Sequence, residues 1–362
     1  MTIVQPTLLV DKERALRNIR EMAEKARRSS VRFRPHFKTH QSAKIGEWFK
    51  QFGVTSITVS SLDMASFFAK HGWDDITVAF PVNLLEIQKI NALANKIQLN
   101  LLVESQETIQ FLNDNLVVDI DIWLKIDVGY HRTGLPLERA DKALELAKEI
   151  QDGHHLQFAG LLTHAGHSYN ARSVEELKEI HLQSVRLLNQ MRDYLEEHGV
   201  TKAQLSIGDT PTCKTVDNFA GVDEIRPGNF VFHDLNQLEI GSCQEEDLAV
   251  AVACPVVAKH PERNELIIYG GAVHFSKNFL VGSNQAKLFG YLTEKASSGW
   301  GALMEDCYIS SLSQEHGIVK LNDAVFDKAA IGDILTILPV HSCLTINLLR
   351  KYLTTDGQEI ND

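Results

Sequence analysis

The sequence predicts an α/β protein: a (β/α)8 barrel followed by a C-terminal β-rich domain. Eight short runs rich in β-branched residues alternate with amphipathic helical stretches through the first two thirds of the 362 residues. Eight such units in about 230 residues is the arithmetic of a closed parallel barrel. After about residue 235 the helical periodicity is mostly lost, and short strands separated by turns dominate.

The eight strand candidates of the barrel are short, apolar and bounded by turn residues. Such runs are typical of strands that are buried on both faces of a parallel sheet. They lie at residues 32–38, 56–61, 75–80, 98–104, 119–127, 158–164, 205–208 and 224–232.

Helical patterns lie between these strands. In residues 42–52 the apolar side chains recur with the three- and four-residue spacing of one helix face, and Gly53 follows as a C-terminal stop. Ser173 with Glu176 predicts a capping box that opens a helix of about 25 residues. Ser105 similarly begins the helix that precedes the fifth strand. The alternation of strand and helix therefore continues through the predicted barrel.

A doubly wound open sheet is the alternative that the same alternation allows. Such a sheet normally offers a dinucleotide-binding turn, G-x-G-x-x-G, after its first strand. Here the corresponding segment is KTHQSAK, residues 38–44, which contains no glycine. The barrel is therefore the favoured architecture.

We expect two domains, because a chain of this length is too long for one small core. The barrel is predicted to cover residues 6–237 and the β-rich domain residues 238–362, with residues 1–5 as a segment that can pair with the second domain. Strands of that domain are expected in EDLAVAVACPVVAKH, NELIIYGGAVHF, CYISSLSQEHGIVKL and DILTILPVHSCLTINLL.

Composition argues against several classes of protein. The formal net charge of −11 disfavours a general nucleic-acid binder, because neutralising phosphates needs a positive face. The longest apolar runs are about strand length, far below the roughly 20 residues that span a bilayer. The first residues lack the basic and apolar regions of a signal peptide, so we expect none. Five scattered cysteines fit a reducing cytoplasm better than a disulfide framework.

Polar and reactive residues gather at the predicted C-terminal ends of the strands, where a barrel carries its active site. The first strand ends at Lys38 in RPHFKTH, and the fifth and sixth run into DVGYHRTG and THAGHSY. The seventh runs into SIGDTPT, and the eighth contains RPGN. We therefore expect the functional site here, in the turn SIGDTPT and among residues that include Lys38, His131, Arg132, His164, His167, Tyr169, Arg226, Gly228 and Asn229.

Lys38 is notable for its basic surroundings in the sequence. A lysine at a strand end is ordinarily a solvated charge. Neighbouring cations and partial burial, however, lower the pKa of a lysine and give the neutral amine that forms a Schiff base. The neighbours in question are Arg32, Arg34, His36, His40 and Lys44.

The turns SIGDTPT and RPGN have the features of an anion cradle. Their glycines, Gly208 and Gly228, allow close approach of the backbone. Free N–H groups at the start of a short helix bind anions, and barrels commonly hold a phosphate after strands seven and eight. A simple helix N-cap at Asp209 explains the same residues. A lysine at one strand end and a phosphate cradle across the barrel mouth together suit pyridoxal 5'-phosphate.

His341 and Cys343 lie two residues apart in PVHSCLTINL. On a strand such residues point to the same face, so an imidazole and a thiolate would be presented together, as Zn²⁺ prefers. Two ligands are too few for a closed structural site, so the pair predicts an open, catalytic one. The alternative is a buried cysteine beside a hydrogen-bonded histidine.

The set of motifs resembles the D-threonine aldolase / D-serine dehydratase family of fold-type III pyridoxal phosphate enzymes, which is related to alanine racemase. RPHFKTH, KIDVGYHRTG, THAGHSY, the Gly-Asp-Thr-Pro-Thr turn, EIRPGNFVFHD, SQEHG and PVHSCLTINL occur in the order seen in that family, over nearly the whole chain. The resemblance implies a barrel followed by a β-domain, and a head-to-tail homodimer in which both subunits shape each site.

The resemblance also implies roles for individual residues. Lys38 matches the Schiff-base lysine, and His164 matches a residue near the cofactor ring. Either Arg132 or Tyr169 matches the partner of the pyridine nitrogen. The remaining matches are Gly208, Asp209, Thr210, Gly228 and Asn229 for the phosphate, and His341 and Cys343 for the metal.

The His-x-Cys pair bears on the reaction. Dehydratases of the family look like His-x-Cys with zinc, whereas its bacterial aldolases look like His-x-Asp with a harder divalent ion. Cys343 therefore favours Zn²⁺ and a dehydratase. The segment YGGAVHFSKN departs from both versions, so His274 and Lys277 are candidates for altering substrate choice. No role is assigned to Glu315 and His316 in SQEHG.

Four activities remain open at this point. The favoured one is elimination from a D-3-hydroxy amino acid to a 2-oxo acid and ammonia, in which the Lys38 amine takes the Cα proton and the metal makes the β-hydroxyl a better leaving group. Retro-aldol cleavage to glycine and an aldehyde would use the same residues. Racemisation would need two bases and no metal. A non-catalytic cofactor carrier would need only the barrel, and the β-domain with its His-x-Cys pair argues against it.

Overall fold

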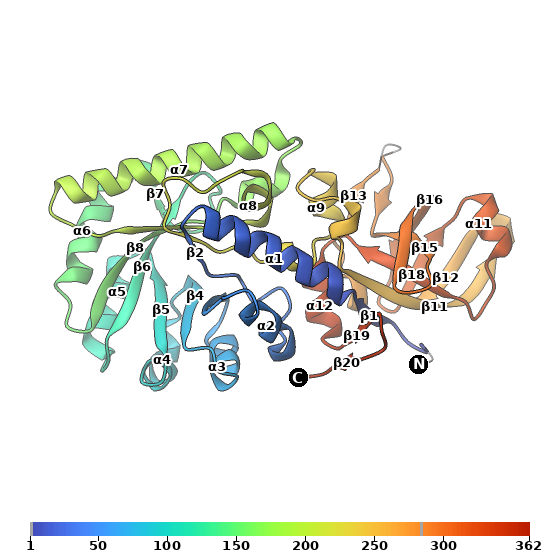
Figure 1. The fold of residues 1–362 in the computed structure, drawn as a ribbon, viewed down its shortest axis with the longest axis horizontal. Helices are drawn as coiled ribbons and strands as arrows, with labels where there is room; N and C mark the ends of the chain where they lie inside the picture. The colour runs from blue at the N-terminus through green and yellow to red at the C-terminus, as the bar shows by residue number, and fades with distance from the viewer. Residues whose placement is uncertain (1–2, 283–284) are drawn as a thin grey trace. The chain divides into compact units, whose positions relative to one another are not determined.

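The structure, a computed structural model, describes residues 3–282 and 285–362. The chain forms two compact units, whose helices and strands are labelled in Figure 1. The barrel unit comprises residues 20–38 and 46–228. The sheet unit comprises the N-terminal residues up to Ile19, residues 39–45 and residues 229–362.

Eight parallel strands form the wall of the barrel unit, in the order β2-β10-β9-β8-β6-β5-β4-β3. A parallel bridge between His36 and Thr58 joins the segment after β2 to β3, so the two ends of the sheet meet. The predicted barrel is confirmed. Its strands are β2 (Arg32–Phe33), β3 (Ser56–Val59), β4 (Asp75–Pro81), β5 (Gln98–Val103), β6 (Ile120–Asp127), β8 (Leu156–Leu162), β9 (Gln204–Ile207) and β10 (Glu224–Ile225), with β7 (Leu135–Pro136) paired to β6 outside this order.

Helices surround these strands (Figure 1). The hydroxyl of Ser173 accepts the N–H of Glu176 at the start of the longest helix, and Ser105 caps its helix in the same way. Both predicted helix starts are confirmed. None of the described helices is long and apolar enough to cross a membrane. The helices are α3 (Leu62–Lys70), α4 (Ile87–Ala94), α5 (Gln106–Asn115), α6 (Ala140–Gln151), α7 (Val174–Glu197) and α8 (Thr210–Thr215), while α1 (Lys12–Arg28) and α2 (Ala43–Lys50) contain residues of both units.

Two predicted barrel strands are shorter than expected. Of residues 32–38 and 224–232, only Arg32–Phe33 and Glu224–Ile225 form strands. Pro35 and Pro227 follow these strands closely, and proline has no N–H to donate to the ladder. The chain after each short strand is therefore irregular, and it is these irregular segments that carry Lys38 and Gly228.

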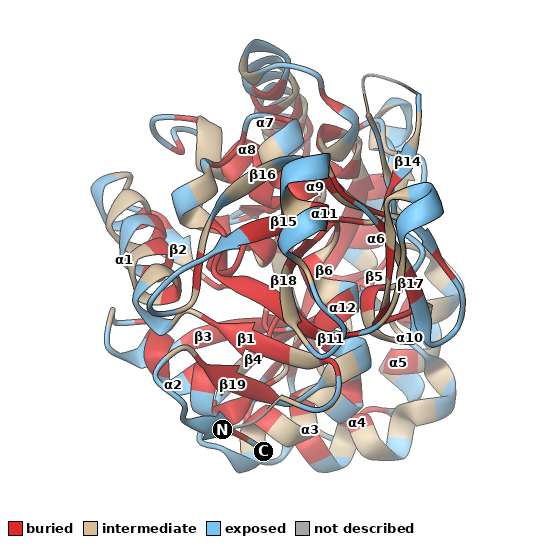
Figure 2. Cartoon of the chain, turned by 90° about the vertical axis from the view of Figure 1, so that its right-hand side faces the viewer, coloured by how far each residue is buried: buried red, intermediate tan, exposed pale blue. Residues whose placement is uncertain are grey.

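Buried polar side chains share the barrel interior with apolar ones. Asn100 accepts a hydrogen bond from the Trp123 indole at 3.2 Å and donates to Asp75 at 3.1 Å. Trp123 itself packs with Leu102 and Leu162 in a small apolar cluster. Figure 2 shows the barrel strands β3, β4, β5 and β6 coloured as buried. Asn100 is buried, so its amide is satisfied by side chains of the barrel and not by bulk water.

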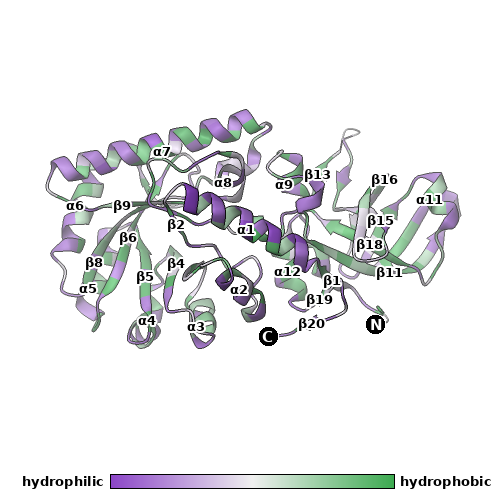
Figure 3. Ribbon diagram, in the orientation of Figure 1, coloured by the Kyte–Doolittle hydropathy of each residue, from purple (hydrophilic) through white to green (hydrophobic). Residues whose placement is uncertain are grey.

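A nine-stranded sheet dominates the sheet unit, in the order β12-β17-β16-β15-β18-β11-β1-β19-β20. The N-terminal strand β1 pairs antiparallel with β11 and parallel with β19. Apolar residues, green in Figure 3, make up much of β11, and a core cluster of the unit includes Leu9, Ala251, Leu338 and Leu353. The strands are β1 (Thr7–Val10), β11 (Val250–His260), β12 (Glu265–Tyr269), β15 (Gly290–Lys295), β16 (Trp300–Leu312), β17 (His316–Lys320), β18 (Ile334–Pro339), β19 (Tyr352–Thr354) and β20 (Glu359–Ile360).

Short elements complete the sheet unit. A two-stranded sheet pairs β13 (Leu280–Val281) with β14 (Lys287–Leu288). Helical segments connect the strands, so the predicted β-rich domain also holds helices. These are α9 (Leu235–Glu239), α10 (Ala272–Phe275), α11 (Asp323–Lys328) and α12 (Ser342–Leu349).

Candidate active site

The turn after β9 is organised by a buried carboxylate. Asp209 caps α8: its Oδ1 accepts the N–H of Thr212 at 2.8 Å and the hydroxyl of Ser168 at 2.9 Å, and its Oδ2 accepts the hydroxyl of Thr212 at 2.9 Å. Burial raises the pKa of Asp209 to about 6. The carboxylate of Asp209 is therefore occupied by hydrogen bonds within the protein. An anion could bind at this turn only through its backbone N–H groups.

Gly208 permits a close approach between two strand ends. A Cβ at this position would lie 2.8 Å from both the carbonyl carbon and the Cβ of Arg226, which no side chain tolerates. The carbonyl of Gly208 accepts a hydrogen bond from Nδ1 of His164. Because Nδ1 must carry the proton, Nε2 of His164 is left as an acceptor. The predicted members of the site after β8 and β9 therefore lie in contact.

The electrostatics of His164 define the character of this site. Burial lowers the pKa of His164 to about 3, although the hydrogen bond to Gly208 opposes the shift. The charges that add to the lowering are all positive and belong to Lys38, Arg132 and Arg226. His164 is therefore neutral at physiological pH, in positively charged surroundings that suit an anionic ligand.

Lys38 lies within reach of these groups. Its backbone N–H donates to Nδ1 of His36 at 3.4 Å, and its side chain is exposed. The pKa of His36 lies well below the usual range because of burial and then the charges of Lys38, Arg226 and His164. The ring centroids of His164 and Tyr169 are 6.2 Å apart, and the Tyr169 hydroxyl accepts the N–H of Thr210 at 3.4 Å. The structure thus brings together Lys38, Arg132, His164, Tyr169, Gly208, Asp209 and Thr210.

The loop after β6 explains the motif KIDVGYHRTG. The carboxylate of Asp127 accepts the N–H groups of Gly129, Tyr130 and His131 at 2.9–3.1 Å. Gly134 has a φ of +114°, and a Cβ there would lie 2.7 Å from the backbone nitrogen of Asp127. The tight loop carries Arg132, whose guanidinium lies 5.0 Å from the ring centroid of Tyr130.

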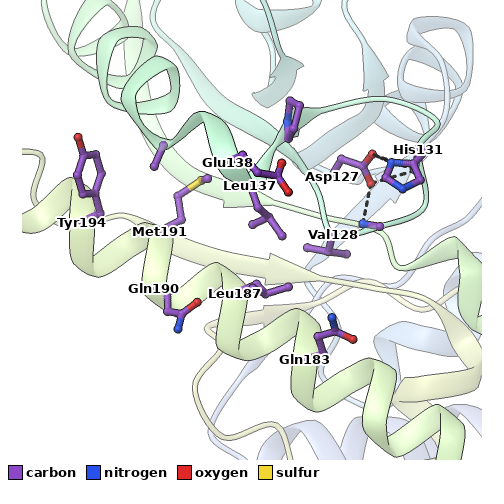
Figure 4. A pocket seen from close by; sticks show the side chains of 13 residues that line it. Asp127, Val128, His131, Leu137, Glu138, Gln183, Leu187, Gln190, Met191 and Tyr194 are labelled. Carbon is purple, nitrogen blue, oxygen red and sulfur yellow. Dashed lines mark hydrogen bonds and ion pairs between the residues drawn. The ribbon is translucent and has the colours of Figure 1, made fainter.

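A pocket of about 670 Å³ adjoins the same loop (Figure 4). Leu187, Met191 and Tyr194 of α7 face Leu137 across it, and Asp127 lies at one end. Apart from that loop, the pocket is lined by Pro136 of β7, the helical turn that follows it and residues of α6 and α7, and none of the predicted cofactor residues lines it. It is therefore separate from the group formed by Lys38 and His164.

Two buried cations of the site were missed by the sequence analysis as cofactor candidates. Arg226 donates from Nη2 to the carbonyl of Thr163 and from Nε to the Ser206 hydroxyl at 2.7 Å. Lys125 donates to the carbonyl of Ile126 at 2.8 Å, and burial lowers its pKa to about 7. The position of Arg226 in RPGN could have signalled its role. Nothing in the sequence around Lys125 marks it as buried.

The interpretation of the basic cluster around Lys38 needs correction. Arg34 is buried and pairs with Glu224 at 2.6 Å and with Asp75 at 2.5 Å. Arg32 also approaches Glu224, at 3.5 Å. These two cations are compensated by carboxylates that are distant in sequence. The positive charge that acts around His164 comes instead from Lys38, Arg132 and Arg226.

The side chain of Lys25 caps the C-terminal end of α8, the helix that begins after Asp209. Its Nζ donates to the carbonyls of Cys213, Lys214 and Val216 at 3.0, 2.8 and 2.6 Å. Carbonyls at a helix C-terminus lack intrahelical donors, and a lysine can satisfy several of them. Burial lowers the pKa of Lys25. No local pattern in the sequence connects this residue of α1 with α8.

Gly228 and Asn229 fall in different units. The side-chain amide of Asn229 donates to Asp234 at 2.7 Å, to Ser342 at 3.0 Å and to the Cys343 sulfur at 3.6 Å. Asn229 is thus a neighbour of the predicted metal ligand Cys343. Its assignment to the phosphate, and that of Gly228, stay predictions.

The His-x-Cys segment is not a strand. β18 ends at Pro339, His341 is the N-cap of α12, and Cys343 lies in the first turn of that helix. The predicted strand is wrong because a tertiary contact decides the conformation: Ser342 donates from its N–H to Asp234 at 2.9 Å. The argument that residues i and i+2 share one face therefore does not apply.

Cys343 nevertheless has polar surroundings. It is half-buried, whereas the other four cysteines are buried. Its thiol donates to the Thr39 hydroxyl at 3.4 Å. Among residues 3–282 and 285–362, no group of three or more His, Cys, Asp or Glu side chains could hold a metal ion. An imidazole and a thiol are the donors that Zn²⁺ prefers, so the pair fits such an ion by chemistry, with two of the usual three protein ligands.

The unassigned residues after β12 form a contact of their own. His274 accepts the N–H of Gly271 at 3.1 Å and lies 3.9 Å from the carboxylate of Glu315. The ring of Tyr269 stands edge-on to His274, with centroids 5.6 Å apart. Lys277 is exposed, and His316 lies opposite Tyr269 on the paired strand.

Known proteins are similar to this chain along nearly its whole length. Residues 10–235 match the family described as alanine racemase, N-terminal domain, and residues 249–355 match the serine dehydratase domain. The chain belongs to the alanine racemase-like family that carries a serine dehydratase domain. The resemblance drawn from the motifs is thereby confirmed.

Individual relatives span nearly the full length. The chain is 29% identical over 384 residues to a D-serine dehydratase of Dictyostelium discoideum, covering 98% of this chain and 95% of that protein. It is 24% identical over 354 residues to a D-threonine aldolase of an Arthrobacter species, covering 95% and 86%. The solved D-threo-3-hydroxyaspartate dehydratase from Delftia sp. HT23 is 28% identical with a TM-score of 0.90, covering 99% and 96%. A Cys-to-Ala variant of that dehydratase was solved in a metal-free form.

The residues of the barrel unit fit pyridoxal phosphate. The fit rests on the positive charges around a neutral His164, on the backbone N–H groups of the turn that Asp209 caps, and on an exposed side chain at Lys38. A phosphate needs positive charge and N–H donors, and the aldehyde needs an amine. Each requirement is met by a side chain or turn of one compact unit.

Proposed function

We propose that this protein is a pyridoxal phosphate-dependent lyase that converts D-3-hydroxy amino acids into 2-oxo acids and ammonia. The observation that carries the proposal is the meeting of Lys38, the neutral His164 and the Gly208 turn at one end of a barrel. Membership of the family supports it, as do the dehydratases among the relatives, two of which are 29% and 28% identical to this chain.

Bound pyridoxal phosphate would supply an aldehyde for the substrate amine and a ring that withdraws electrons from Cα. The side chains of the protein would position the cofactor and transfer protons. Lys38 is the proposed covalent anchor, and its amine then takes the proton from Cα. His164 presents its Nε2 as an acceptor, because Nδ1 is committed to Gly208. The positive groups around His164 neutralise the anionic parts of the cofactor.

His341 and Cys343 are the proposed ligands of a divalent metal, with Zn²⁺ favoured by the thiol. An ion held there would supply Lewis acidity toward a substrate hydroxyl. Support comes from the polar surroundings of Cys343 and from the relative whose Cys-to-Ala variant was solved without metal.

Retro-aldol cleavage to glycine and an aldehyde is the second candidate. The aldolases among the relatives support it, since they match over most of this chain. Elimination is favoured because Cys343 provides a soft ligand and because two of the four dehydratases among these relatives match at 29% and 28% identity, against 24% for the two aldolases. D-serine, D-threonine and D-threo-3-hydroxyaspartate are the substrates that the relatives' names indicate.

Product analysis separates these activities. Purified protein loaded with pyridoxal phosphate and Zn²⁺ is incubated with D-threonine or D-serine, with and without a chelator, and with the L-enantiomers as controls. We expect ammonia with 2-oxobutyrate or pyruvate, and loss of both on chelation. Glycine with acetaldehyde means an aldolase. The opposite enantiomer, formed in the presence of chelator, means a racemase, and cofactor binding without any product means a carrier.

We also propose that the protein is a homodimer. Exposed apolar side chains of the sheet unit line a groove of about 540 Å³: Val4, Tyr269, Val273 and Leu348. Apolar surface rimmed by polar residues marks association sites, and a second copy of the chain is the proposed occupant. Sedimentation should give the mass of two chains, and Val273→Asp with Leu348→Asp should give one. A wild-type monomer at micromolar concentration contradicts the proposal.

A cytoplasmic location is proposed from the thiols. Cys213, Cys254 and Cys307 are buried and form no disulfide, which is typical of proteins from reducing compartments. Localisation of a tagged protein by microscopy tests this, and secretion would contradict it.

A further inference from the structure

The pocket beside the loop after β6 has the size of a small-molecule site and an apolar wall. Its volume of about 670 Å³ lies within the range of roughly 300–1,000 Å³ that encloses small ligands. Leu187 and Met191 of the wall come from α7, and Val128 and Leu137 come from the segment that follows β6 (Figure 4). All of the lining residues belong to the barrel unit. The pocket can therefore hold an apolar body without a contribution from the sheet unit.

Polar side chains without protein partners accompany this wall. The carboxylate of Glu138 forms no hydrogen bond or ion pair with any residue that the structure describes, and the same holds for the side-chain amides of Gln183 and Gln190. Glu138 and Asp127 lie on the side of the pocket opposite α7 (Figure 4). A few polar groups around an apolar wall are the features by which small-molecule sites orient a ligand.

The charge of the lining selects the kind of ligand. Asp127 and Glu138 are carboxylates, and none of the described residues that line the pocket is Lys or Arg. Burial alone would raise the pKa of Asp127, but hydrogen bonds from three backbone N–H groups of its loop, led by that of His131, lower the pKa overall. Asp127 is therefore ionised at neutral pH. Such a lining attracts a cation and repels a carboxylate or a phosphate.

Asp127 also connects the pocket to the loop that carries Arg132. Its Oδ2 lies 3.1 Å from Nδ1 of His131, whose side chain is 86% exposed. A cationic ligand would replace that imidazole at the carboxylate, because an exposed ion pair contributes little stability. The carboxylate oxygens also accept the backbone N–H groups that shape the loop. A ligand bound at Asp127 would therefore act on the loop and on the position of Arg132.

We propose that this pocket binds a small organic amine, an ammonium group on an apolar body, as an effector of the barrel site. The ammonium group would lie between Asp127 and Glu138, with the apolar body against Leu187 and Met191. The bound amine would change the affinity for the cofactor through the loop that Asp127 organises. Two ligands that act on one shared element change each other's affinity by the same factor. The coupling rests on the proposed function, whereas the binding of the amine does not.

N,N-Dimethylphenethylamine is the probe for this site. It is a cation at neutral pH and, as a tertiary amine, forms no Schiff base with pyridoxal phosphate. Calorimetric titration into the cofactor-free protein should show one saturable site. Phenylpropionate, which has a similar body with an anionic group, should not bind. Equal binding of the two compounds would mean that the carboxylates select nothing, and it overturns the inference.

Two variants and their matched controls locate the probe. Glu138→Gln should weaken its binding by about tenfold, since a hydrogen bond to a charged group becomes a neutral one. Gln190→Trp should abolish binding by filling the pocket. Glu145→Gln on α6 and Leu182→Trp on α7 change exposed positions outside the pocket and should bind as the wild type does. Wild-type binding in both Glu138→Gln and Gln190→Trp overturns the site. If Gln190→Trp does not fold, Glu138→Gln decides alone.

The coupling is measured by titrating pyridoxal phosphate into cofactor-free protein with and without saturating probe. We expect the affinity for pyridoxal phosphate to change by about fivefold or more in the wild type and in Glu145→Gln, and to stay constant in Gln190→Trp. An affinity that the probe leaves unchanged in the wild type overturns the effector role. Failure of the proposed function is distinct, because the wild-type protein would then bind the probe but no pyridoxal phosphate.

Discussion

The end of the barrel that carries Lys38 and the segment that carries Cys343 are built in different ways. Around Lys38 the side chains are held by other side chains and by backbone: His164 by Gly208, Arg226 by Ser206, and Asp209 by Ser168 and Thr212. Around Cys343 the contacts include hydrogen bonds that involve its sulfur, from the Asn229 amide and to the Thr39 hydroxyl.

The difference indicates which of the two regions is preformed. Polar groups that are already paired keep their geometry without a ligand. A metal ligand such as the proposed Cys343 thiol gains order from the ion that it binds. We therefore expect the barrel site to bind its cofactor independently of the sheet-unit site, and we expect the two to fail separately when mutated.

The largest effect is expected for Lys38→Ala. Turnover should fall by at least about a thousandfold, because the covalent anchor and the base are removed together. The visible absorbance of the bound cofactor should disappear, while the zinc content stays at the wild-type level. Lys44→Ala, an exposed lysine six positions away, is the control and should retain both. Loss of zinc together with the cofactor would contradict the expectation that the barrel unit and the sheet unit bind their ligands independently.

Cys343→Ala should produce the converse result. We expect turnover to fall by about a hundredfold or more, since a metal ligand is lost, with the cofactor absorbance unchanged. Metal content measured by atomic emission should drop to background. Cys307→Ala, a buried cysteine of β16, should keep its metal. Full activity in Cys343→Ala would mean that the metal assignment is wrong.

Lys25→Met tests how far the barrel site depends on remote support. Three carbonyls at the end of α8 would lose their donor, and we expect affinity for pyridoxal phosphate to fall by about tenfold, with a smaller loss for pyridoxal. Lys214→Met is the matched control, because this side chain forms an ion pair with Glu21 instead. Equal losses of affinity for the two ligands would show that Lys25 does not act on binding through the turn after β9, which is proposed to hold the phosphate.

The smallest effect concerns acid stability of the barrel unit. Burial lowers the pKa of His181 to about 4, from an ordinary value near 6.5. The unfolded chain binds this proton below pH 6.5 and the folded chain does not, so stability falls as the pH drops from 6.5 toward 4. His181→Gln should flatten this dependence by up to about 1.4 kcal/mol per pH unit, as measured by urea unfolding. A slope identical to wild type would contradict the burial of a neutral imidazole.

Local patterns were sufficient to predict much of the fold. The Ser173 and Ser105 caps, the eight barrel strands and the reactive residues at their ends follow from periodicity and spacing over a few residues. Patterns failed where distant residues decide the outcome. Asp234 binds Ser342 and favours a helix where β-branched residues indicated a strand. Glu224 and Asp75 neutralise Arg34, which the sequence shows only as one of several nearby cations.

The same limit explains what was missed in the site. Lys125, with a pKa of about 7, has the property that the sequence argument assigned to Lys38. Its burial arises from packing inside the barrel, which no short motif encodes. Arg226 was visible in RPGN, but its link to Glu224 through the Ser206 hydroxyl depends on the register between β9 and β10.

The choice between Lys38 and Lys125 as the covalent anchor gives the most direct test of the proposed chemistry. Protein loaded with pyridoxal phosphate is reduced with borohydride, digested, and the pyridoxyl-labelled peptide is located by mass spectrometry. We expect the label on Lys38, in the peptide that contains HFKTH. A label on the buried Lys125, or no label at all, would contradict the assignment on which the proposed chemistry depends.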